Sequence, residues 1–172
     1  CNGYLDVPPV NRHILSAHLG GNVILTDLIP GNRVSKGQVV LSLQNIEFLK
    51  LQQDYLETKE KLAYLKSVYE TQTTLAGENI SSRKNQQLAR TEYMGMLAKF
   101  ESLSKQLKMI HIDPEAVTAE NMASVIRVTS PVDGFLTKMN VENGMFVQPS
   151  TDMCEILNPD HFHLELKVYE KD

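Results

Sequence analysis

The side chains that could bind metal or act in acid–base catalysis are few and scattered. Histidines stand at positions 13, 18, 111, 161 and 163. His161-Phe162-His163 would place two imidazoles on one face of an expected strand, a spacing that suits a metal ion. No third ligand accompanies this pair, and no histidine stands at a recognised distance from a nucleophile. The sequence therefore predicts no catalytic residue, no metal site and no bound cofactor.

Other reactive or modifiable positions also favour structural roles. Lys36-Gly37 lacks the Gly-Lys-Ser/Thr order of a phosphate loop. Asn79-Ile80-Ser81 matches a glycosylation sequon, and we interpret it as turn chemistry. Cys154 stands at an expected core position and is predicted to be a buried free thiol. Cys1 is either a lipidation site or the boundary of a longer chain, and both alternatives stay open.

Composition excludes several classes of protein. The 172 residues are 42% hydrophobic, which suits one or two small folded units. The net charge of −4, without a basic cluster, argues against nucleic acid as a partner. No apolar run approaches the ~20 residues that span a membrane. Without an initiator Met or a signal sequence, the chain is expected to be a mature form or an excised fragment.

Two segments, 16–43 and 129–156, are degenerate copies of one β-rich unit. When the two copies are aligned, the same shift in residue number relates Gly21 to Gly134 and Gly31 to Gly144. We call this shift the repeat offset. At the same offset the coinciding apolar pairs are Val23 with Leu136, Leu28 with Val141, Val34 with Val147, Leu41 with Cys154, and Leu43 with Ile156. A unit this short cannot bury its apolar face alone, so the copies must pack against each other. The insert between them must therefore leave and return as a hairpin.

The insert has the heptad spacing of a coiled coil. On its first arm the seam positions are Phe48, Leu51, Tyr55, Thr58, Leu62, Leu65, Tyr69, Gln72 and Ala76. On its second arm they are Gln86, Ala89, Tyr93, Met96, Phe100, Leu103, Leu107 and Ile110. This pattern predicts two antiparallel helices, each roughly 45 Å long. The polar positions Gln72 and Gln86 make the layers nearest the reversal the weakest.

Helix-ending signals place the reversal of the insert at 75–82. Gly77 is predicted to end the first helix in a left-handed conformation. Ser81 or Ser82 is expected to cap the second helix. After the hairpin, Asp113-Pro114-Glu115 has the order of cap and first turn of a short helix.

The β-rich half-units resemble those of biotinyl/lipoyl domains. In a carrier domain of that family, a tight hairpin bearing the modified Lys joins the halves. Here the helical insert replaces that hairpin, and Lys138 falls in the middle of a strand by the repeat alignment. A carrier domain of an acyl- or carboxyl-transfer enzyme is therefore the alternative function.

A lipoyl unit split by a helical hairpin resembles the periplasmic membrane fusion proteins, the HlyD-like adaptor subunits of RND-type tripartite efflux pumps. The segments that resemble the CusB-like, heavy-metal-efflux branch run in the order Gly3-Tyr4-Leu5-Asp6-Val7-Pro8-Pro9, Tyr55-Leu56-Glu57-Thr58-Lys59, Glu92-Tyr93, Ser130-Pro131-Val132-Asp133-Gly134, and Leu164-Glu165-Leu166-Lys167-Val168-Tyr169-Glu170-Lys171-Asp172. The resemblance is carried by this order rather than by a single motif, and it implies a fragment of a longer protein.

The resemblance implies an α+β fold, a split lipoyl-like β-sandwich interrupted by an antiparallel coiled-coil hairpin, with partial β-barrel strands at both ends. The implied segments are a barrel strand at 1–12, the first lipoyl half at 13–45, the helical hairpin at 46–112, a short helix and linker at 113–124, the second lipoyl half at 125–159, and the start of the barrel at 160–172.

The resemblance also implies a non-enzymatic adaptor in the periplasm, attached to the membrane. Its expected partners are an inner-membrane RND-type transporter and a TolC-like outer-membrane channel, with self-association into a ring, a hexamer for the full-length protein. The exported compounds would be metal ions or small toxic compounds. A further alternative is an adaptor that also hands metal to its transporter, with ligands in segments outside this chain.

Family members dock the hairpin tip on the channel through an Arg, a Leu and a Ser around the reversal. Ser81 matches the Ser, whereas Leu75 lies one residue from the expected Leu, which is Thr74 here. The expected Arg is Glu70, and Arg83 of the other arm would replace it. The resemblance thus implies a partner-binding tip made of Leu75, Gly77, Asn79, Ser81 and Arg83.

Overall fold

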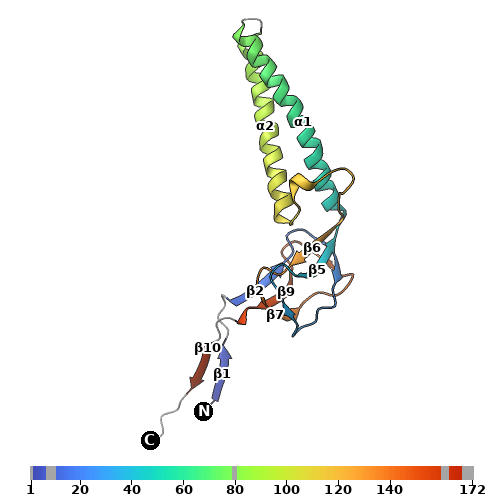
Figure 1. The fold of residues 1–172 in the computed structure, drawn as a ribbon, viewed down its shortest axis with the longest axis vertical. Helices are drawn as coiled ribbons and strands as arrows, with labels where there is room; N and C mark the ends of the chain where they lie inside the picture. Colours follow the sequence, from blue (N-terminus) through green and yellow to red (C-terminus); the bar gives the residue numbers. More distant parts are fainter. Residues whose placement is uncertain (1, 7–10, 79–80, 160–162, 168–172) are drawn as a thin grey trace. The chain divides into compact units, whose positions relative to one another are not determined.

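The computed structural model describes residues 2–6, 11–78, 81–159 and 163–167, with side chains over 11–78 and 81–159. The chain divides into two compact units, Cys1–Asn45 together with Arg127–Asp172, and Ile46–Ile126. The first unit is built of strands and the second is mainly helical (Figure 1). The predicted α+β class is confirmed.

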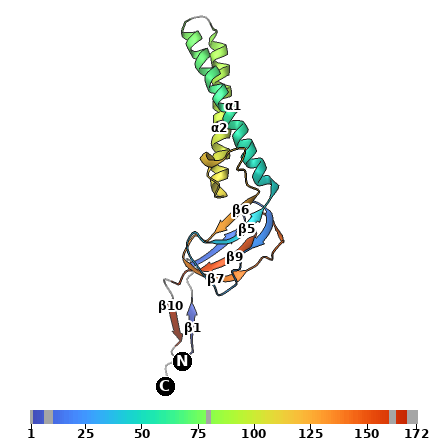
Figure 2. The same ribbon diagram turned by 45° about the vertical axis from the view of Figure 1, so that its right-hand side comes forward.

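Two four-stranded sheets form most of the strand-rich unit (Figure 2). One sheet has the order β2-β9-β7-β4, and the other has the order β6-β5-β3-β8. The strands are β2 Arg12–Ser16, β3 Gly21–Leu25, β4 Arg33–Val34, β5 Val39–Gln44, β6 Val125–Thr129, β7 Gly134–Met139, β8 Phe146–Val147 and β9 Asp152–Leu157. Each sheet therefore takes two strands from each sequence copy, and the copies interlock.

The repeat offset that relates the sequence copies also relates the strands. It sets β2 on β6, β3 on β7, β4 on β8 and β5 on β9, so the repeat extends over 12–44, beyond the segment found by sequence. Backbone hydrogen bonds follow the same offset. The N–H of Gly31 donates to the carbonyl of Leu136 at 2.7 Å, and the N–H of Gly144 donates to that of Val23 at 2.8 Å. The unit is thus pseudo-symmetric down to single hydrogen bonds.

The core of this unit lies between the two sheets. Val34, Leu136, Cys154 and Ile156 from one sheet and Val40 from the other are fully buried. Cys154 is a free thiol, as predicted, and burial raises its pKa to about 11. The thiol therefore stays protonated at neutral pH and serves as a small apolar side chain.

A separate two-stranded antiparallel ladder joins β1 (Asn2–Asp6) to β10 (His163–Lys167), with Leu5 opposite Leu164. These are the strands expected at the two ends of the chain, and they pair with each other. Their membership of a β-barrel stays a prediction.

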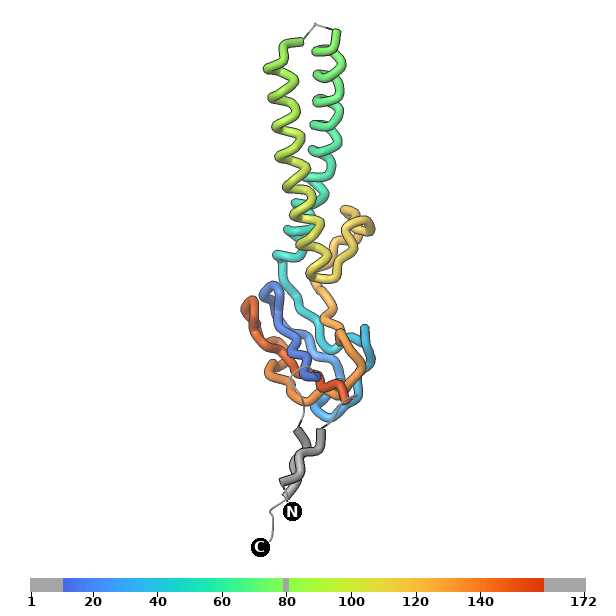
Figure 3. Tube along the Cα trace, turned by 90° about the vertical axis from the view of Figure 1, so that its left-hand side faces the viewer, coloured from blue at the N-terminus to red at the C-terminus, as the bar shows by residue number. Residues whose placement is uncertain are grey.

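The helical unit contains α1 (Ile46–Gly77), α2 (Arg83–Met109) and one 3₁₀ turn, η2 (Pro114–Ala116). The two long helices lie side by side in opposite directions (Figure 3). Every seam position predicted from the heptad spacing is buried or half-buried. Within the residues that the structure describes, no helix is both long and apolar enough to cross a membrane.

Packing between α1 and α2 is tightest at the end where α1 begins, which we call the base. Phe48, Tyr55 and Leu107 are fully buried there, and the Tyr55 ring stacks on Phe100 with 5.1 Å between centroids. The other end, the tip, has Gln72 in the seam, and its side chain is only half-buried. The expected weakening of the seam toward the tip is therefore visible in the burial of its layers.

A buried glutamine holds the segment after α2 against the base. The Gln52 amide donates to the carbonyls of Phe48 at 2.6 Å and Ala123 at 2.9 Å, and its oxygen accepts from the Ala123 N–H at 3.1 Å. Asp113 caps the short helix by accepting from the Glu115 N–H at 3.1 Å. The short helix is a single 3₁₀ turn, with Asp113 in the expected capping role.

We predict opposite effects of exchanging glycine and serine at two positions related by the repeat. Gly37 and Ser150 coincide at the repeat offset, and both have positive φ, 82° and 67°. Side chains cost about 1–2 kcal/mol in this region, so Gly37→Ser should lower the free energy of unfolding by about 1 kcal/mol. Ser150→Gly should raise it by less than about 1 kcal/mol, since the added chain entropy of glycine offsets part of the gain.

Urea unfolding of both variants checks this prediction. The two positions lie in equivalent turns, so each variant is the control for the other. A stabilising Gly37→Ser, or a Ser150→Gly that destabilises as much as Gly37→Ser, would contradict the assigned turn conformation.

Candidate functional site at the hairpin tip

The turn between α1 and α2 is closed by two hydrogen bonds from Ser81. Its N–H donates to the Leu75 carbonyl at 3.1 Å, and its Oγ donates to Gln72 Oε1 at 2.7 Å. The second bond joins the turn to the seam of α1. Gln72 was expected only as a weak seam layer, and it is the residue that positions Ser81. Asn79, another predicted tip residue, lies outside the described residues.

Two expectations about how the helices end at the tip are settled by this geometry. Ser82, one of two expected candidates, is the cap of α2, with its side chain accepting from the Asn85 N–H at 3.3 Å. Gly77 is the last residue of α1 and does not adopt positive φ, so the predicted left-handed ending was wrong. The Ser81 N–H satisfies the Leu75 carbonyl, so α1 needs no left-handed residue to finish its last turn.

The structure brings the described tip residues together around the reversal. Leu75 and Ser81 are half-buried, whereas Gly77 and Arg83 are exposed. The surface of the tip therefore combines part of an apolar side chain, a residue without a side chain and an exposed cation.

The charges at the tip oppose the stability of the helices that carry them. Arg83 and Lys84 open α2, whose first turn has no acidic residue. The last turn of α1 has no basic residue, and Glu78 follows it. A helix favours negative charge at its N-terminus and positive charge at its C-terminus. Helix stability therefore does not account for this pattern of charges.

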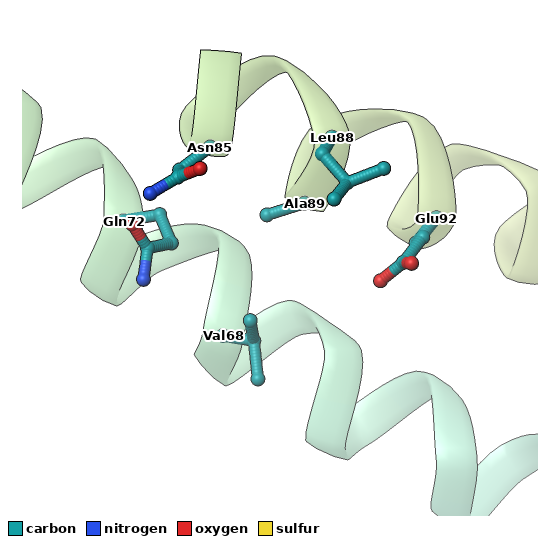
Figure 4. Close-up of a pocket in the computed structure, with 6 residues that line it drawn as sticks. All are labelled: Val68, Gln72, Asn85, Leu88, Ala89 and Glu92. Atoms are coloured by element: carbon teal, nitrogen blue, oxygen red, sulfur yellow. The ribbon is translucent and has the colours of Figure 1, made fainter. Parts of the chain in front are cut away.

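A groove of about 200 Å³ lies on one flank of the hairpin near the tip. Its lining residues are Val68 and Gln72 of α1, and Asn85, Leu88, Ala89 and Glu92 of α2. Figure 4 shows Gln72 and Asn85 at one end of the groove and Glu92 at the other. Leu88 is 59% exposed, so an apolar side chain faces solvent on this flank.

The described residues contain no group of three His, Cys, Asp or Glu side chains that could hold a metal ion. His13 lies on β2, His18 follows that strand, and His111 follows α2. The structure does not bring these three together. His161 lies outside the described residues, and of His163 only the backbone is described.

Lys138, the lysine weighed for a carrier function, is the last residue but one of β7. Its Nζ is 3.4 Å from Glu155 Oε2. Burial raises the pKa of Glu155, but the hydrogen bond from Thr137 and the charges of Lys138 and Arg12 outweigh burial and hold that pKa below its usual value. Lys138 therefore neutralises a carboxylate on the sheet, whereas a swinging arm needs a lysine on an exposed turn.

No family model and no curated protein matches this chain. Among solved structures, a putative efflux transporter from Bacteroides eggerthii is 18% identical, with a TM-score of 0.64 over 94% of this chain and 45% of that one. A MacA-MexA chimera containing the Pseudomonas aeruginosa MexA α-hairpin domain is also 18% identical, with a TM-score of 0.66 over 98% of this chain and 54% of that one.

The membrane fusion protein Spr0693 from Streptococcus pneumoniae is 16% identical, with a TM-score of 0.58 over 94% of this chain and 64% of that one. The chain thus spans between 45% and 64% of these three proteins. The likeness covers nearly all of this chain, so it has the fold of membrane fusion proteins, and the resemblance predicted from sequence is confirmed at the level of fold.

We predict that Arg83→Glu stabilises the hairpin. The substitution places a carboxylate in the first turn of α2, where the helix dipole favours negative charge, so the free energy of unfolding should rise by about 0.3–1 kcal/mol. Lys99→Glu, the same charge change in the middle of α2, is the control and should give no such gain. Thermal unfolding at low and high salt measures the effect, which salt should screen. Destabilisation by Arg83→Glu would show that Arg83 makes a stabilising contact within the hairpin.

Proposed function

We propose that this chain is the hairpin-bearing part of a periplasmic adaptor that links an inner-membrane efflux transporter to an outer-membrane channel. The observation that carries the proposal is made at the tip of the long hairpin, where exposed charged side chains are present although they lower the stability of the two helices. The likeness in fold to a membrane fusion protein and to a putative efflux transporter supports it.

The geometry of the hairpin suits a reaching and docking role. Its first helix, α1, has 32 residues, which corresponds to roughly 48 Å. Fully buried aromatic side chains stiffen the base, whereas the seam near the tip contains half-buried glutamines. Layers with few buried apolar contacts open most readily. A stiff base with an adaptable tip allows the hairpin to carry a binding surface that engages and releases a partner.

The partners that we propose follow the implied architecture. The tip residues Leu75, Gly77, Asn79, Ser81 and Arg83 would contact a TolC-like channel. The strand-rich unit would face an RND-type transporter, with copies of the whole protein assembled in a hexameric ring. The protein would be attached to the membrane on the periplasmic side, by a lipid on Cys1 or by an anchor outside this chain. The coiled-coil geometry of the hairpin and the barrel at the ends of the chain belong to the same proposal.

Arg83→Glu tests the docking step, because it should raise stability and lower export together. In cells lacking the parent protein, a full-length copy with Arg83→Glu should fail to restore resistance, while Lys99→Glu should restore it. Equal protein levels by immunoblot exclude loss through degradation. Suppressor mutations selected in the outer-membrane channel would locate the contact. Full resistance with Arg83→Glu combined with Leu75→Ser would exclude the tip as the docking surface.

The exported substrate is a second testable point, and we propose metal ions or small toxic compounds. Deletion of the parent gene should raise intracellular copper, silver, zinc, cobalt or nickel, with sensitivity to the same metal, measured beside a panel of dyes and detergents. Accumulation of organic compounds alone would leave the adaptor standing and exclude the heavy-metal branch.

A further inference from the structure

The two flanks of the hairpin, on either side of the seam, differ in chemistry near the tip. Successive residues of a helix are 100° apart. A residue one position before a seam residue therefore lies on the opposite side of the helix from a residue three positions before it. Val68 of α1 and Glu92 of α2 lie on one side and line the same groove. We call this side the groove flank. Lys66, Arg83 and Arg90 lie on the other side, which we call the basic flank.

The charges of the two flanks are opposite in sign. Within the helical residues 64–77 and 83–95, Glu92 is the one charged residue on the groove flank. The basic flank of the same segments carries three cations and one carboxylate, and that carboxylate, Glu70, is 3.9 Å from Lys66. All of these charged side chains are exposed. The groove flank therefore presents a carboxylate beside an apolar groove, and the basic flank presents an excess of positive charge.

Exposed apolar side chains lie on both flanks. Leu88 borders the groove and is 59% exposed. Met94, one helical turn beyond Arg90, is 46% exposed and lies on the side of the basic flank. A methionine adapts readily to an irregular apolar surface. The basic flank therefore combines an excess of positive charge with one adaptable, exposed apolar side chain.

This division selects how two copies of the hairpin can associate. If the groove flanks of two copies were in contact, the Glu92 carboxylates would repel each other. If two basic flanks were in contact, their cations would repel each other. Contact between the groove flank of one copy and the basic flank of the next sets opposite charges together. Such a head-to-tail contact leaves one free flank at each end, so it repeats from copy to copy and gives a ring where the rotation between copies closes.

We propose that the groove flank binds the basic flank of a second copy of this chain, with Arg90 of one copy beside Glu92 of the next. The proposal rests on the adaptor function proposed above, in which copies stand side by side. It adds the surface that joins them and the polarity of that contact.

Charge exchange between the two flanks tests the proposal. Arg90→Glu sets two carboxylates together at every contact, and Glu92→Arg sets two cations together, so each should weaken self-association roughly tenfold or more. The double variant Arg90→Glu with Glu92→Arg reverses both charges and should return association to near the original strength. Sedimentation velocity over a range of concentrations measures this, with circular dichroism to confirm that each variant is helical.

Lys105→Glu, on the outer face of α2 away from both flanks, is the matched control and should leave association unchanged. A double variant no stronger than either single variant would overturn the pairing of Arg90 with Glu92. A parent chain that stays monomeric up to its solubility limit would also overturn the proposal. Neither result bears on docking at the tip, which the resistance of cells carrying Arg83→Glu decides separately.

Discussion

Neither sequence copy can complete a sheet by itself, and this constraint governs the rest of the structure. β4 of the first copy pairs with β7 of the second, and β3 of the first pairs with β8 of the second. The edge strand β2 likewise pairs with β9 of the other copy. Any segment inserted between the copies must therefore bring the chain back to the same pair of sheets. A helical hairpin meets this requirement, because its two ends lie close together whatever its length.

The two ends of the helical unit differ in how strongly they are packed. The base holds the aromatic stack of Tyr55 on Phe100 and the hydrogen bonds of Gln52 to Ala123. The Tyr55 hydroxyl is buried there without a hydrogen-bond partner. The apolar packing of the base therefore offsets the free-energy cost of burying that hydroxyl. The tip has weaker layers and charges that the helix dipoles disfavour. The buried layers of the base thus stabilise a hairpin whose tip would be poorly stable by itself.

Features with a fixed spacing were the ones that the sequence could predict. The repeat offset located the paired strands, because identical folds need apolar residues at identical positions. The heptad stripe located the packed face of both helices. Asp113 was found as a cap, and Ser82 was one of two candidate caps, because such side chains act on nearby backbone. The free thiol of Cys154 was placed in the core through its equivalence to Leu41.

What the sequence could not predict depends on contacts between distant residues. Gln52 lies beside the seam, and its role comes from Ala123, 71 residues later. Gln72 could not be recognised as the partner of Ser81, because a glutamine in a seam also fits a weak layer without further function. The groove needs both helices in register, so neither stretch of sequence shows it alone. The prediction for Gly77 was wrong for the same reason, because a hydrogen bond from the Ser81 N–H determines how α1 ends.

The repeat has two openings where the chain enters and leaves the sandwich. The repeat offset sets Asn45, before the hairpin, on Asn158, and sets Asn11 on Ser124. At one opening the Asn158 N–H donates to the Asn11 carbonyl at 2.9 Å. The other opening leads into α1. The sandwich thus meets the rest of the chain at two places that the repeat offset relates. A circular permutation that exchanged the insert and the termini would keep every strand pairing of the two sheets. The strand pairings of the sandwich therefore place no limit on the length of the segment inserted between the two copies.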